Sequence, residues 1–211
     1  YEHPGFHFWS SGAGLVQDVS PIDEDEFKKK TNAEIAMYIN SYNEKVETSW
    51  KGDFTEINLA SSVSKFVSND PTRFSTNLTP FLSVPRKYQH GFLRGFEEAW
   101  RNNKDFDWSE ILPFVKQIIE DGIFWGEEKK NVEYDYSRWI ADTIADLIQE
   151  GTKDDKHAFS PDLLPVAEQI ILLLLKNVKS DMSLMNDLVT SVLNSSKGKV
   201  FMAALSYSLR Y

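Results

Sequence analysis

The sequence predicts an all-α protein, in which antiparallel helix pairs stack into a right-handed α-solenoid. Three observations support this class. Helix-start signals recur along the chain, either as capping boxes or as proline at the first helical position. Apolar residues follow each start at helical spacing, and no segment alternates cleanly between apolar and polar residues. The start signals are Thr31–Glu34, Asp53–Glu56, Asp70–Pro71, Val84–Pro85, Asp107–Glu110 and Ser160–Pro161.

Residues 1–20 differ from the rest of the chain, because they are rich in aromatic residues and glycine and show no helical period. We expect an extended arm whose rings lie on the first helices. Residues 21–211 are expected to form a single helical-repeat domain. Because the chain begins with Tyr1 instead of methionine, and Tyr211 follows an apolar-periodic segment without a stop signal, we expect a fragment of a longer chain.

In the first half of the domain, apolar residues such as Ile35 and Ile39 recur at the spacing that puts them on one side of a helix. Pro80 is expected to bend its helix or to split off the last turn. These helices are expected over residues 23–29, 32–41, 55–68 and 71–82.

Residues 86–102 form the clearest predicted helix, because apolar side chains recur along one side of it from Tyr88 to Ala99. Gly91 and Gly95 lie on this helix, where each glycine costs about 1 kcal/mol of helix stability relative to alanine. We explain them by the close approach of a neighbouring helix.

In the second half, the segment 165–178 is apolar around nearly its whole circumference, so we expect it to be the most buried helix. Trp100 and Trp139 lie at helical spacing with other apolar residues and are expected in the core. The remaining helices are expected over residues 108–121, 137–150, 184–193 and 200–209.

Composition narrows the possible functions. The chain has no cysteine, which excludes disulfides, thiolate zinc sites and cysteine nucleophiles. Its longest apolar run, residues 170–175, is much shorter than the roughly 20 residues of a membrane span, so we expect no membrane contact. The lack of cysteine and of a secretory signal leads us to expect a cytoplasmic protein. The net charge is −9. Residues 61–104 nevertheless hold seven bases and three acids, a local net charge of +4.

No catalytic motif stands out. The two closest histidines, His3 and His7, have the four-residue spacing of metal ligands on a helix. Pro4 and Gly5 lie between them and disfavour a helix there, so we expect no metal site. The segment 11–14 has the glycines of a phosphate loop but lacks its lysine. We therefore expect no catalytic, cofactor or metal site, and no enzyme activity.

Basic residues on the helix over 86–102 supply the clearest functional hint. They lie opposite its apolar side, where they would face nucleic acid or an acidic peptide. Alternatively they form a solvated face, because Glu97 and Glu98 are placed to pair with Arg101 and Arg94. We favour the solvated face. This predicted basic ridge consists of Arg86, Lys87, His90, Arg94 and Arg101.

Two tryptophans lie in predicted loops, unlike those at helical spacing. They are Trp50 and Trp125. Exposed tryptophans are enriched at binding surfaces, so we include both as candidate partner contacts.

Three stretches resemble the HEAT-like helical-repeat regions of large, poorly characterised bacterial proteins. They are residues 193–210, 70–74 and 106–112. The long helices also fall into pairs about 35–45 residues apart, as in HEAT-type repeats. Some of these bacterial proteins resemble NTPases or defence proteins whose catalytic modules lie elsewhere in the chain. The resemblance implies a repeat scaffold and provides no functional residue.

The sequence therefore predicts a non-catalytic scaffold or interaction segment of a larger bacterial protein. Its partner would be another protein or other domains of the same polypeptide, bound on a rigid curved surface. The alternative is a nucleic-acid-binding module that accompanies an NTPase or nuclease domain elsewhere in the chain.

Overall fold

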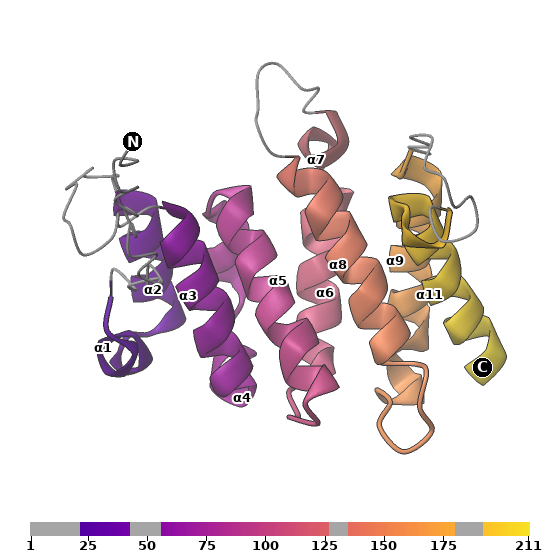
Figure 1. Ribbon diagram of the computed structural model, residues 1–211, viewed down its shortest axis with the longest axis horizontal. Coiled ribbons are helices and arrows are strands. Elements are labelled where there is room, and N and C mark those ends of the chain that lie inside the picture. Colours follow the sequence, from indigo (N-terminus) through magenta and orange to yellow (C-terminus); the bar gives the residue numbers. More distant parts are fainter. Residues whose placement is uncertain (1–21, 43–55, 127–134, 180–191) are drawn as a thin grey trace, which may run out of the picture.

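The computed structural model describes residues 22–42, 56–126, 135–179 and 192–211. All regular structure in these ranges is helical, which confirms the all-α class (Figure 1). The predicted arm over residues 1–20 lies outside the described residues, as does most of the predicted helix over 184–193.

Most of the long helices lie where the sequence predicts them. The Thr31 capping box forms, with the Thr31 hydroxyl accepting from the Glu34 N–H and the Glu34 carboxylate accepting from the Thr31 N–H. The elements are α1 (Glu24–Lys29), α2 (Asn32–Ser41), α3 (Glu56–Asn69), α4 (Pro71–Phe74), the 3₁₀ helix η1 (Thr79–Ser83), α5 (Arg86–Arg101), α6 (Trp108–Glu120), α7 (Gly122–Gly126), α8 (Tyr136–Glu150), the 3₁₀ helix η2 (Pro161–Leu163), α9 (Leu164–Asn177) and α11 (Ser196–Arg210).

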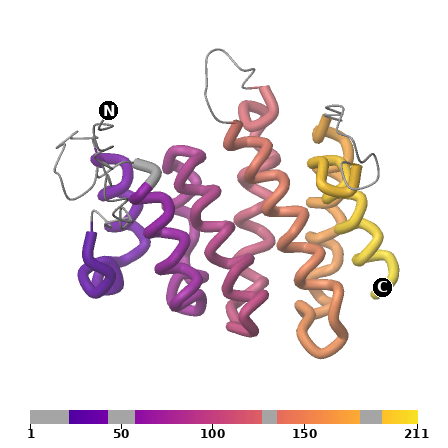
Figure 2. Tube along the Cα trace, viewed as in Figure 1, coloured from indigo at the N-terminus to yellow at the C-terminus, as the bar shows by residue number. Residues whose placement is uncertain are grey.

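The long helices form two layers. In the first layer α3 packs on α5, α5 on α8 and α8 on α11, and all four run in the same direction (Figures 1 and 2). In the second layer α6 packs on α9, and both run opposite to the first layer. Each of α5 and α8 is thus followed by a returning helix. The right-handed, HEAT-like repeat itself stays a prediction.

Glycines bring α3 and α5 close together. A Cβ on Gly91 would lie 2.7 Å from the Ala60 carbonyl oxygen, and one on Gly95 would lie 2.6 Å from the Ser64 carbonyl oxygen. Because carbon and oxygen atoms cannot approach that closely, any larger residue would push the two helices apart. The close approach that we expected from the sequence is confirmed.

One predicted helix is interrupted earlier than expected. The segment 71–82 does not continue to Pro80, since α4 ends at Phe74. Asn77 then takes a left-handed conformation with φ 51°, which ends the helical path before η1 begins. Pro80 lies in the first turn of η1, where its missing N–H leaves no hydrogen bond unmade.

The expectation that residues 165–178 form the most buried helix is wrong. In α9 the fully buried side chains lie on one face, while Leu172 is 57% exposed and Leu173 is half-buried. The reason is that α9 lies in the second layer and packs against α6 and α11, which leaves its far side uncovered.

None of the helices in the described part of the chain combines the length and the apolar character that crossing a membrane requires.

Candidate functional site

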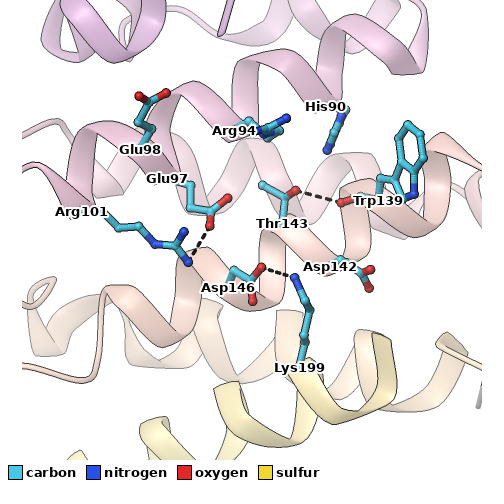
Figure 3. Close-up of a pocket in the computed structure, with 10 residues that line it drawn as sticks. All are labelled: His90, Arg94, Glu97, Glu98, Arg101, Trp139, Asp142, Thr143, Asp146 and Lys199. Atoms are coloured by element: carbon cyan, nitrogen blue, oxygen red, sulfur yellow. Dashed lines mark hydrogen bonds and ion pairs between the residues drawn. The ribbon is translucent and has the colours of Figure 1, made fainter. Parts of the chain in front are cut away.

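A cleft of about 390 Å³ opens where α5, α8 and α11 meet, and we call it the α5–α8–α11 cleft (Figure 3). Because α5 and α8 run side by side, the polar faces of both helices flank the opening. The lining side chains come from residues between His90 and Arg101 on α5, from residues between Trp139 and Asp146 on α8, and from Lys199 on α11.

Two of the three cationic side chains in the cleft are held in ion pairs. The Arg101 guanidinium lies 2.8 Å from the Glu97 carboxylate and 3.2 Å from the Glu150 carboxylate. The Lys199 ammonium lies 2.5 Å from the Asp146 carboxylate. These contacts tie α5 to α8 and α8 to α11, so they serve the packing of the first layer.

The third cation, Arg94, is exposed and makes no ion pair with any described residue. Glu98, four positions further along α5, projects away from α8 in Figure 3. The ion pair between Arg94 and Glu98 that their spacing predicts is therefore not formed. Arg94 instead lies next to His90 at the edge of the cleft (Figure 3).

His90 is held neutral by its surroundings. Burial, together with the smaller effect of the positive charge of Arg94, lowers the pKa of His90 to about 4. The ring centroid lies 5.7 Å from that of Trp139 and 6.2 Å from that of Tyr136. At neutral pH His90 therefore forms an uncharged aromatic wall together with two rings from α8.

Two carboxyl groups in the cleft have raised pKa values. Burial raises the pKa of Asp142 against the opposing effects of the Ser196 hydroxyl and Lys199. One Asp142 oxygen, Oδ1, is buried without a hydrogen-bond partner among the described residues. Burial also raises the pKa of Glu97, an effect that Arg101 opposes. Both carboxylates are thus poorly solvated, which disfavours further negative charge beside them.

The predicted basic ridge does not form one continuous surface. Three of its members, His90, Arg94 and Arg101, line the cleft. Arg86 instead lines a second hollow, formed by α2, η1, α5 and α6, and its guanidinium lies 4.6 Å from the centre of the Phe124 ring. The Lys87 ammonium lies 5.4 Å from the Tyr88 ring. The ridge is divided because these two residues begin α5 and turn towards aromatic rings there.

The predicted surface tryptophans need correction. Trp50 lies outside the described residues. Trp125 lies in α7 and not in a loop, and it is half-buried, because its indole N–H donates to the Ile119 carbonyl at 2.7 Å. Trp139, expected in the core, is 37% exposed and lines the cleft. Trp100 is buried as expected.

The sequence contains a signal for Trp139. The apolar stripe of α8 is formed by Ile140, Ile144 and Leu147, whereas Trp139 shares its side of the helix with Asp142 and Asp146. A tryptophan on the polar side of an amphipathic helix faces solvent or a ligand.

Comparison of the chain with family models, with curated proteins and with solved structures finds no match. Among the residues that the structure describes, no group of three His, Asp or Glu side chains could hold a metal ion.

Proposed function

We propose that this chain is a non-catalytic helical-repeat scaffold that binds a segment of another protein, or of another domain of the same polypeptide. The support is the two-layer arrangement, in which successive first-layer helices run in one direction and second-layer helices return between them. In a right-handed, HEAT-like α-solenoid each pair contacts its neighbours and leaves an outer face open for a partner. The lack of cysteine agrees with a reducing compartment such as a bacterial cytoplasm.

The observation that carries this proposal is the chemistry of the α5–α8–α11 cleft. It combines a partly exposed indole, an exposed arginine and several carboxylates on a row of packed helices. Tryptophan and arginine dominate binding energy at protein interfaces, where charged groups of both signs set the orientation.

His90 and Asp146 are poorly suited to acid–base catalysis. A general acid or base works best when its pKa lies near the operating pH. His90 has a pKa of about 4, and the Asp146 carboxylate is bound to the Lys199 ammonium. These two side chains therefore support binding instead of proton transfer.

A nucleic-acid-binding module is the alternative. Arg94 and Trp139 are the residue types that contact a phosphate and stack on a base. Against it, the cleft also holds Glu97, Asp142 and Asp146, which would repel neighbouring phosphates, and the whole chain has a net charge of −9. We therefore favour a protein partner.

Selection from a random peptide library displayed on phage tests the proposal. The enriched peptides are compared on the unmodified chain, on the cleft variant Arg94→Ala/Trp139→Ala, and on the matched variant Lys65→Ala/Leu172→Ala, whose sites are exposed outside the cleft. We expect peptides that bind the unmodified chain and the matched variant but lose binding to the cleft variant. Enrichment of no peptide, or equal binding to all three proteins, would contradict the proposal.

A further inference from the structure

Among the described residues, Arg94 is the cationic side chain of the cleft that forms no ion pair. The structure describes ion pairs for Arg101 and Lys199, and none for Arg94. A guanidinium binds a carboxylate through two parallel hydrogen bonds, which are stronger than bonds between neutral groups. A ligand carboxylate is therefore the group that this end of the cleft recognises best.

An aromatic surface lies beside that charge. The rings of Trp139 and Tyr136 meet edge to face with centroids 5.1 Å apart, and His90 closes the corner from α5. Trp139 is 37% exposed, so its indole offers apolar surface to an incoming side chain. In Figure 3 His90 lies between Arg94 and Trp139. A group that binds a carboxylate and a surface that binds an apolar side chain therefore lie close together in the cleft.

We propose that the corner formed by Arg94, His90 and Trp139 binds an acidic residue that is followed or preceded by a large apolar residue in a peptide partner. Arg94 takes the carboxylate, and the apolar side chain packs on the indole. This inference rests on the proposed function and names the chemistry of its partner.

A single carboxylate fits this corner better than a polyphosphate. The negative charges of Asp142 and Asp146 lie on the same face of α8 as Trp139. Burial already destabilises the charged form of Asp142. A phosphate chain would bring several further negative charges past these groups, whereas one peptide carboxylate brings a single charge, next to Arg94.

Blocked dipeptides test the proposal on the full chain. The probes are N-acetyl-Glu-Phe-amide, its neutral twin N-acetyl-Gln-Phe-amide, and the cationic N-acetyl-Lys-Phe-amide. Binding is followed by nuclear magnetic resonance at the Trp139 indole N–H, whose signal is assigned by its loss in Trp139→Phe. We expect a saturable shift with the glutamate probe and at least about tenfold weaker binding of the other two, because hydrogen bonds to charged groups contribute that much.

Two variants separate the Arg94 charge from net charge. Arg94→Gln should bind the glutamate probe as weakly as the glutamine probe, while Lys65→Gln, an equal charge change on α3, should keep the difference. Circular dichroism checks that both variants stay folded.

The proposal is overturned if the glutamate and glutamine probes bind equally, if Arg94→Gln leaves the preference unchanged, or if no probe shifts the signal. Tighter binding of oligothymidylate than of the glutamate probe, lost in Arg94→Gln, would overturn it in favour of a nucleic-acid site. Selection of neutral peptides that still need Trp139 would keep the proposed function and remove only this inference.

Discussion

At the scale of single residues, the cleft contains charges of two kinds. The side chains of Arg101, Glu97 and Glu150 balance one another across α5 and α8, with the two carboxylate side chains only 12% exposed. Arg94 and His90 lie one turn apart on α5 and take part in none of these ion pairs, and the charge of Arg94 helps to keep His90 neutral. Residues of the first kind hold helices together, and we propose that those of the second kind contact the partner.

The neutral state of His90 predicts a loss of stability in acid. The unfolded chain binds a proton on this histidine below about pH 6.5, whereas the folded chain does so only near pH 4. The free energy of unfolding should therefore fall as the pH drops from 6.5 to 4, by up to about 3 kcal/mol from this group. Urea titrations of the unmodified chain and of His90→Gln at several pH values measure the difference.

The carboxyls of Glu97 and Asp142 have raised pKa values and contribute with the opposite sign, since the folded chain binds their protons first. They remain in both proteins, so the difference between the two curves isolates His90. Parallel curves over this pH range would show that His90 is not held neutral.

Part of the cleft follows from the sequence and part does not. The pair of Glu97 and Arg101 is predictable, because residues four apart are neighbours on a helix surface. The contact of Arg101 with Glu150 joins residues 49 positions apart, and only the packing of α5 on α8 creates it. The same packing places Trp139 beside His90 and leaves the indole exposed.

At the scale of elements, the contact between α3 and α5 depends on missing side chains. Gly95→Ala would place a Cβ 2.6 Å from both the Ser64 oxygen and the Val67 Cβ, so the helices must separate. We expect a loss of about 1–3 kcal/mol in the free energy of unfolding, despite the better helix propensity of alanine. Chemical denaturation measures it.

Gly122→Ala is the matched control, because a Cβ there meets nothing within 4 Å. It should change the free energy of unfolding by about 0.5 kcal/mol or less. Equal effects at the two glycines would mean that α3 and α5 are not packed as the structure shows.

The one-sided burial of α9 gives a second prediction at this scale. Leu174→Ala should destabilise the fold by about 2–5 kcal/mol, because Leu174 is completely buried and its truncation leaves a cavity. Leu172→Ala, two positions away on the exposed face, should cost less than about 1 kcal/mol. Thermal unfolding of both variants measures these losses of stability. A larger loss for Leu172→Ala than for Leu174→Ala would show that α9 buries the opposite face.

Helix starts were easier to predict than helix interiors. Capping side chains act within one turn, so Thr31, Asp70 and Asp107 mark their helices correctly. The sequence did not locate the break at Asn77, and α6 continues through Pro113 although proline usually interrupts a helix. Apolar residues lie around nearly the whole of α9, so the sequence likewise did not indicate which sides other helices would cover.

At the scale of the whole molecule, the net charge of −9 outweighs the basic segment of the chain. In a gel-shift assay at about 150 mM salt, micromolar protein should form no complex with single- or double-stranded nucleic acid. A complex that disappears in the triple variant Arg86→Ala/Arg94→Ala/Arg101→Ala would contradict the scaffold proposal and support the nucleic-acid-binding module.

The central claim is that the row of α5, α8 and α11 presents a binding surface for a protein segment. Titration of a library-selected peptide into the isotope-labelled chain, with backbone amide signals assigned, tests it most directly. The account predicts that the perturbed amides cluster between His90 and Arg101, between Trp139 and Asp146, and around Lys199. Perturbations confined to another region, such as the second hollow beside Arg86 and Gln117, would contradict it.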